Sequence, residues 1–150
     1  MYDHHSTIAL LTESVFRTLA RYQLGADELF ERSGIALNDS HVSVSSIETG
    51  KITNFWHSVT ELTDNPSIGF EIGSNVYPTN LHILGYAWLA SLTLERAFRR
   101  FNRYYSVYTS SYHCEIREEE DALSLVVEMK PEAAAEARDC AMAMLMNLCR

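Results

Sequence analysis

Apolar residues recur every three or four positions over most of the chain, which is the spacing of amphipathic helices. The first such run covers residues 6–22 and is built on Leu11, Val15 and Leu19. The same pattern predicts further helices over 26–34, 45–63, 64–73 and 79–90, from Ser91 or Thr93 through an Arg-rich stretch, and from Pro131 onward. Residues 35–44 are expected to form a loop or an extended link.

Cap residues and glycines predict where these helices begin and end. Gly34 is expected to end the second helix, because glycine adopts the left-handed conformation at helix C-termini without a steric penalty. Asp64 or Asn65 is expected to cap the helix that follows, with Pro66 in its first turn and Gly73 at its end.

Two β-rich segments interrupt the helical pattern late in the chain. "SYHCEIRE" (111–118) and "ALSLVVEM" (122–129) flank an acidic run, Glu118–Asp121, which predicts an antiparallel hairpin with a solvated turn. The expected fold class is therefore α+β, mostly helical with a small antiparallel sheet late in the chain, and residues 1–150 are expected to form one domain.

The Arg-rich stretch "LTLERAFRRFNRYYSV" is strongly amphipathic. Its expected apolar side consists of Leu94, Phe98, Phe101, Tyr105 and Tyr108. Its polar side consists of Arg96, Arg99, Arg100 and Arg103. Two interpretations of these arginines stay open: a surface that binds an anion or a partner, or a solvated helix face paired with nearby glutamates.

Composition narrows the class of protein. The formal net charge is −8, which disfavours DNA or RNA binding by this chain alone. The three cysteines, Cys114, Cys140 and Cys149, form no disulfide or zinc pattern, which predicts a reducing compartment. No segment has the basic start of a signal peptide or the length of a membrane span, so we expect a cytoplasmic protein without membrane contact.

Sequence motifs for catalysis, metal binding or cofactor binding are missing. No P-loop, G-x-S-x-G or H-E-x-x-H motif occurs, and the glycines of "IGFEIG" bracket a short helix, which disfavours phosphate cradling. His113 and Cys114 are adjacent on a predicted strand, so their side chains would point to opposite faces. We therefore expect no enzyme, no metal and no cofactor.

A small-molecule pocket is the best candidate site, because such pockets are mainly apolar and contain a few polar groups. Buried tyrosines suit this role, since a ligand can supply the hydrogen-bond partner that a phenol needs. The expected ligand-binding residues are Trp56, Tyr86, Arg103, Tyr104 and Tyr105. The alternative is that most of these aromatic residues belong to the hydrophobic core.

The order of motifs resembles a known family. "DNPSIGFEIG", "LGYAWLASLTLERAFRRFNRYYSV" and the following hairpin are similar to the N-terminal, arabinose-binding-like effector domain of AraC-type bacterial transcription regulators. The similarity extends more weakly upstream and covers essentially the whole chain. The helix-rich pattern predicts that the fold is not the sugar-binding jelly roll of the arabinose regulator itself.

The resemblance implies a domain that senses a small-molecule effector and forms a homodimer. DNA would be bound only through a C-terminal helix-turn-helix domain, which the chain lacks, and the final helical pattern runs on without a stop signal, so the chain is expected to be a fragment. The alternative function is a protein–protein interaction and dimerisation module that binds no small molecule.

Overall fold

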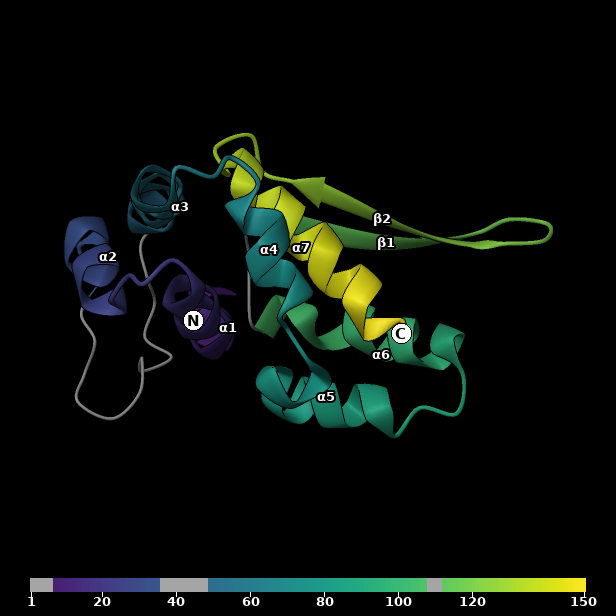
Figure 1. Ribbon diagram of the computed structural model, residues 1–150. Helices are drawn as coiled ribbons and strands as arrows, with labels where there is room; N and C mark the ends of the chain where they lie inside the picture. Colours follow the sequence, from purple (N-terminus) through teal and green to yellow (C-terminus); the bar gives the residue numbers. More distant parts are fainter. Residues whose placement is uncertain (1–6, 36–48, 108–111) are drawn as a thin grey trace.

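The computed structural model describes residues 7–35, 49–107 and 112–150 (Figure 1). Its elements in chain order are α1 (Thr7–Arg21), α2 (Ala26–Ser33), α3 (Thr49–Thr63), α4 (Ile68–Ser74), the 3-10 helix η1 (Pro78–Leu81), α5 (His82–Leu89), α6 (Leu94–Tyr104), the 3-10 helix η2 (Tyr105–Val107), β1 (Tyr112–Glu118), β2 (Leu123–Met129) and α7 (Ala135–Leu148). The fold is mostly helical α+β with one small antiparallel sheet and is not a jelly roll, which confirms the expected class.

Helices α4 and α7 lie side by side at the centre of the molecule, with α1–α3 toward one side and α5, α6 and the hairpin toward the other (Figure 1). Two glycines of α4 allow this close approach. A β-carbon at Gly73 would lie 2.3 Å from the carbonyl oxygen of Cys140 in α7. Gly73 was expected to close α4; instead it lies inside the helix, and Asn75 is the C-cap residue.

Several helices begin later than the sequence predicts. Helix α4 begins at Ile68 with Ser67 as its N-cap, and Asn65 accepts the Ser67 N–H through its side-chain oxygen at 2.9 Å in the turn before the helix. Helix α7 begins at Ala135, because the residues after Pro131 form a separate turn. The proposed loop and the predicted start of the third helix, residues 36–48, lie outside the described residues.

The helix predicted over residues 79–90 is divided in two. A 3-10 turn, η1, comes first, and His82 has a φ of 47°, in the left-handed region that non-glycine residues rarely adopt. Asn80 lies inside η1, where its side chain accepts the Tyr77 N–H at 2.8 Å. Asn80 therefore stabilises the turn before α5 and is not the N-cap of one continuous helix.

Strands β1 and β2 pair antiparallel in the register Tyr112↔Met129 to Glu118↔Leu123, which confirms the predicted hairpin. The hairpin extends away from the helices (Figure 1). Tyr112 and Cys114 are buried beneath it, whereas His113 between them is exposed. The strand therefore separates the side chains of His113 and Cys114 as its two-residue period requires.

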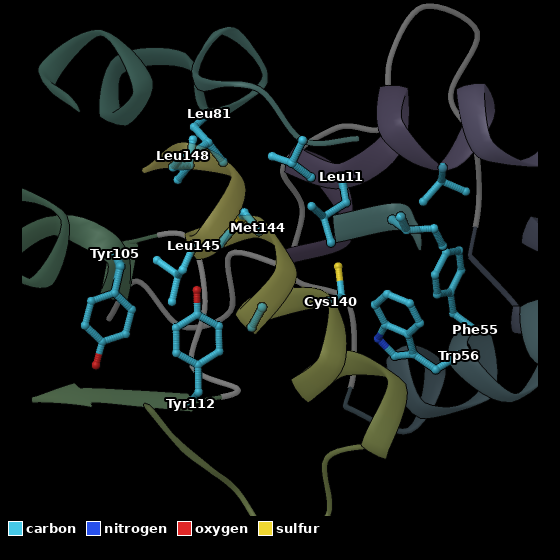
Figure 2. Packing of buried hydrophobic residues seen from close by; sticks show 14 of the residues in the cluster. Leu11, Phe55, Trp56, Leu81, Tyr105, Tyr112, Cys140, Met144, Leu145 and Leu148 are labelled. Carbon is cyan, nitrogen blue, oxygen red and sulfur yellow. The ribbon is translucent and has the colours of Figure 1, made fainter. Parts of the chain in front are cut away.

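Aromatic rings connect α5, α6 and the sheet in one row. Trp88 meets the rings of Phe98 and Phe101 edge to face, Phe101 stacks on Tyr105, and Tyr105 stacks on Tyr112 with ring centroids 5.4 Å apart. Figure 2 shows the last two rings lying parallel beside α7. The aromatic side of α6 is thus the core side, as its sequence predicts.

Two residues of the predicted apolar side of α6 are not part of this buried aromatic row. Leu94 was expected to be buried, but it is 47 % exposed, because it is the first residue of the helix and lies beyond the aromatic row. Tyr108 lies outside the described residues.

Candidate functional site

The core contains one small apolar cavity of about 20 Å³ between α1, α3, α7 and the sheet. Its lining includes Trp56, Tyr112 and Cys140, and Figure 2 shows the Cys140 sulfur pointing between Leu11 and Trp56. Burial raises the pKa of the Cys140 thiol to about 12 and raises the pKa of the Tyr112 phenol. The space suffices for about one water molecule and not for a metabolite.

A larger, open and polar groove lies between α6 and β1. Its volume is about 630 Å³, within the range of small-molecule sites. Helix α6 and strand β1 line it with Arg99, Arg100, Asn102, Arg103, His113, Cys114, Glu115 and Ile116. This groove is the candidate site, because its size, openness and charged lining fit a small polar ligand.

The four arginines of α6 have different environments. Arg99 forms ion pairs with Glu95, at 2.9 Å, and with Glu118 of β1. Arg100 donates to the carbonyl oxygen of Ala87 and to the hydroxyl of Ser91, each at 3.2 Å, and so connects α6 to the end of α5. The interpretation as glutamate-paired arginines therefore describes Arg99 but not Arg100.

Arg96 and Arg103 have no side-chain hydrogen bond or ion pair within the described part of the chain, and both are exposed. Arg103 lines the groove, whereas Arg96 lies outside its lining. Arg103 is thus the groove cation whose donors are available to a ligand.

Tyr105 supports the base of the groove. Its hydroxyl accepts the backbone N–H of Cys114 at 2.8 Å and lies 3.3 Å from Nδ1 of His113. Because the hydroxyl oxygen already accepts one hydrogen bond, its own proton can be donated to Nδ1. This arrangement favours the His113 tautomer with the proton on Nε2, so the ring presents an N–H donor at its other end.

Two further lining residues shape the polarity of the groove. The side-chain oxygen of Asn102 is buried without a hydrogen-bond partner in the described structure. Glu115 is held by Arg117 at 2.9 Å, and this hydrogen bond lowers the pKa of the Glu115 carboxyl. The groove therefore combines donors for an anion with one fixed negative charge at its rim.

The predicted ligand-binding residues lie in different places. Arg103 lines the groove, buried Tyr105 lies beneath it, and buried Trp56 lines the separate core cavity. Tyr104 and Tyr86 are exposed, on α6 and on α5, and line neither space. The ligand-binding role of all five residues stays a prediction.

Asn102, His113 and Glu115 were not among the ligand-binding residues expected from the sequence. Alternation along β1 places His113 and Glu115 on one face, whereas α6 and η2 contact the other face at Tyr112 and Glu118 and the strand edge at the Cys114 N–H. Local periodicity does not encode this tertiary contact.

The described residues contain no group of three or more His, Cys, Asp or Glu side chains that could hold a metal ion. Within the same residues, no helix is long and apolar enough to cross a membrane.

Comparison with known proteins places these features in a family. The model of the N-terminal arabinose-binding domain of AraC transcription regulators matches residues 24–150, from before α2 to the end of the chain. No curated protein and no solved structure gives a significant match. The match covers most of the chain and confirms the resemblance seen in its motifs. The chain belongs to the family of N-terminal arabinose-binding domains of AraC transcription regulators.

Proposed function

We propose that this domain senses a small metabolite and couples its binding to the dimer arrangement and DNA binding of a transcription regulator. The observation that carries the proposal is the groove between α6 and β1, whose size suits a metabolite and which contains Arg103, a cation without an ion-pair partner among the described residues. The family supports a regulatory role for the domain. In this proposal the domain has no catalytic activity, acts in the cytoplasm and contacts DNA only through a helix-turn-helix domain.

The proposed mechanism is a population shift. A ligand that binds one conformation or dimer arrangement more tightly than another increases its population by the difference in binding free energy. The groove is suited to such coupling, because its wall β1 is bonded to Tyr105, whose ring stacks on Tyr112 beside α7. A ligand that draws α6 and β1 together would therefore change how the sheet packs against α7.

Thermal unfolding in the presence of a metabolite panel tests this proposal. A ligand at 100 times its dissociation constant should stabilise the domain by about 2.7 kcal/mol. The same ligand should alter reporter expression when the domain is attached to its DNA-binding partner. If no compound stabilises the domain or changes reporter output, ligand sensing is wrong.

A second candidate function is a dimerisation module without a ligand, and a specific surface favours it. Ile83, Tyr86 and Leu89 recur every three residues along α5 and are 74 %, 67 % and 60 % exposed. Leu92, just beyond the helix, is also exposed. Contiguous exposed apolar surface of this kind is typical of protein contacts.

Light scattering across a concentration series measures the oligomeric state and so tests the dimerisation function. If α5 forms the dimer contact, Leu89→Asp should shift the chain toward the monomer, whereas Phe70→Asp, at an exposed apolar residue of α4, should not. Dimerisation that depends on Leu89, together with no response to any metabolite, would favour the second function over the first.

A further inference from the structure

We infer that the groove between α6 and β1 binds a small monocarboxylic acid, whose carboxylate is held by Arg103 and by the Nε2–H of His113. This inference rests on the proposed metabolite sensing and specifies the chemical class of the metabolite. Three observations support it: Arg99 and Arg100 already have partners whereas Arg103 has none among the described residues, His113 is oriented by Tyr105, and the buried oxygen of Asn102 has no partner among the described residues.

Arg103 is the first element of the site. A guanidinium group matches a carboxylate with two parallel N–H donors, which makes charge-assisted pairs of this kind strong and specific in geometry. Arg99 already uses its donors on Glu95 and Glu118, and Arg100 uses donors on Ala87 and Ser91. Arg103 has no such partner among the described residues and lines the groove directly.

The charge balance limits the ligand to a single negative charge. Arg99 with its two glutamates carries one net negative charge, Arg100 and Arg103 carry one positive charge each, and Glu115 is neutralised by Arg117. The groove and its paired residues therefore hold about one net positive charge, which the exposed Glu128, opposite His113 on β2, reduces further. A multiply charged anion such as phosphate would exceed this positive charge and meet more repulsion from the surrounding carboxylates than a monocarboxylate would.

His113 supplies the second donor. The Tyr105 hydroxyl favours the tautomer in which Nδ1 accepts and Nε2 carries the proton, as described above. With Nδ1 accepting from Tyr105, the ring of His113 offers the groove one donor, Nε2–H. Tyr105 is in this view a positioning residue that acts through His113 and does not touch the ligand.

The remaining lining residues fit the rest of such a molecule. Ile116, on the opposite face of β1 from His113, contributes apolar surface at the edge of the groove. The buried side-chain oxygen of Asn102 lacks a hydrogen-bond partner among the described residues. A rotation of Asn102 toward the groove would satisfy this amide with a bound molecule or an ordered water.

Binding is tested by NMR titration of the chain with three probes: butyrate, its uncharged isostere butyramide, and inorganic phosphate. Butyrate should shift the resonances of α6 and β1, and butyramide should bind at least tenfold more weakly, because it lacks the charge that pairs with Arg103. Equal binding of butyrate and butyramide, or tighter binding of phosphate, would overturn the inference.

Matched arginine variants identify the residue responsible. Arg103→Ala should weaken butyrate binding at least tenfold and Arg103→Lys should restore part of it. Arg96→Ala should leave butyrate binding unchanged, because Arg96 is an exposed arginine of the same helix that lies outside the groove lining. Both residues are exposed, so these variants should fold normally. Equal losses in the Arg96 and Arg103 variants would show non-specific attraction and overturn the site.

The role of Tyr105 has its own readout. The ring ¹⁵N shifts of His113 should report the Nε2–H tautomer in the native chain and a mixture of tautomers in Tyr105→Phe. A native mixture would overturn the positioning role. The inference can fail while the proposed function holds. A panel metabolite that stabilises wild type and Arg103→Ala equally would support metabolite sensing but would exclude this groove as the binding site.

Discussion

Gly69 of α4 and Glu136 of α7 lie so close together that a β-carbon on Gly69 would be only 2.1 Å from the Glu136 carbonyl oxygen. Gly73, one helical turn later, makes the equivalent approach to Cys140. Residues four apart lie on the same face of a helix, so the two glycines form a flat surface against the backbone of α7. The short α4 is thereby held at the centre of the domain by contact with a helix that lies far from it in sequence.

Gly69→Ala should therefore destabilise the domain. The added methyl group would overlap a backbone oxygen that no side-chain rotation can move away, and α4 would have to shift from α7. Over-packing of this kind costs about 1–3 kcal/mol, occasionally more. Urea unfolding followed by circular dichroism should show a lower midpoint with an unchanged slope.

Gly50→Ala is the matched control for this prediction. Gly50 is exposed in the first turn of α3, and a β-carbon there would meet nothing within 4 Å. Alanine also has the higher helix propensity, by up to about 1 kcal/mol. The control should be neutral or slightly stabilising. A Gly69→Ala variant as stable as the Gly50→Ala variant would contradict the close packing of α4 on α7.

Adjacent tyrosines offer a second matched test. Tyr105→Phe removes the acceptor of the buried Cys114 N–H and should cost about 1–3 kcal/mol of unfolding free energy, because a buried donor is left unsatisfied. Tyr104 is exposed, and Tyr104→Phe should change the stability by less than about 0.5 kcal/mol. Thermal or urea unfolding of both variants measures the difference, and equal effects would contradict the contact between η2 and β1.

The start of α6 depends on Thr93. Its side-chain oxygen accepts the backbone N–H of Arg96 at 3.2 Å, which satisfies one of the free donors at the helix N-terminus. Thr93→Ala should destabilise the domain by about 1 kcal/mol, whereas Thr93→Ser, which keeps the hydroxyl, should retain most of the stability. If serine destabilises as much as alanine does, lost packing and not the cap explains the effect.

Helix types and the hairpin could be predicted because their signals are local. A hydrophobic period of 3.6 residues was sufficient to predict helices α1 and α6, and the β-rich composition of β1 and β2 was sufficient to predict the hairpin. Gly34 was placed correctly as a C-cap, since its φ of 68° is a local requirement. Gly73 was misplaced, because a glycine that ends a helix and one that packs against another helix look alike in sequence.

The candidate site was less predictable, since it depends on which surfaces meet. The arginines were correctly assigned to the polar face of α6, but their different partners arise from α5 and β1. Nothing local to "RRFNR" indicates that Arg99 forms ion pairs whereas Arg103 has no partner in the described part of the chain. Likewise, the ring of Tyr105 belongs to the core while its hydroxyl contacts the Cys114 N–H and the ring of His113, and nothing local in the sequence indicates these contacts.

The three cysteines should differ in reactivity toward maleimide. Burial raises the pKa of Cys114 to about 11 and that of Cys140 to about 12, and both side chains are almost fully inaccessible, whereas Cys149 is exposed. Because the thiolate is the reactive form, native protein near neutral pH should acquire one label, at Cys149, and unfolded protein should acquire three. Mass spectrometry with peptide mapping counts and locates the labels, and Cys149→Ser is the control that should remain unlabelled while folded. Rapid native labelling of Cys140 would contradict the packing of α7 against α1 and α3, because the Cys140 side chain lines the core cavity with Leu11 and Trp56.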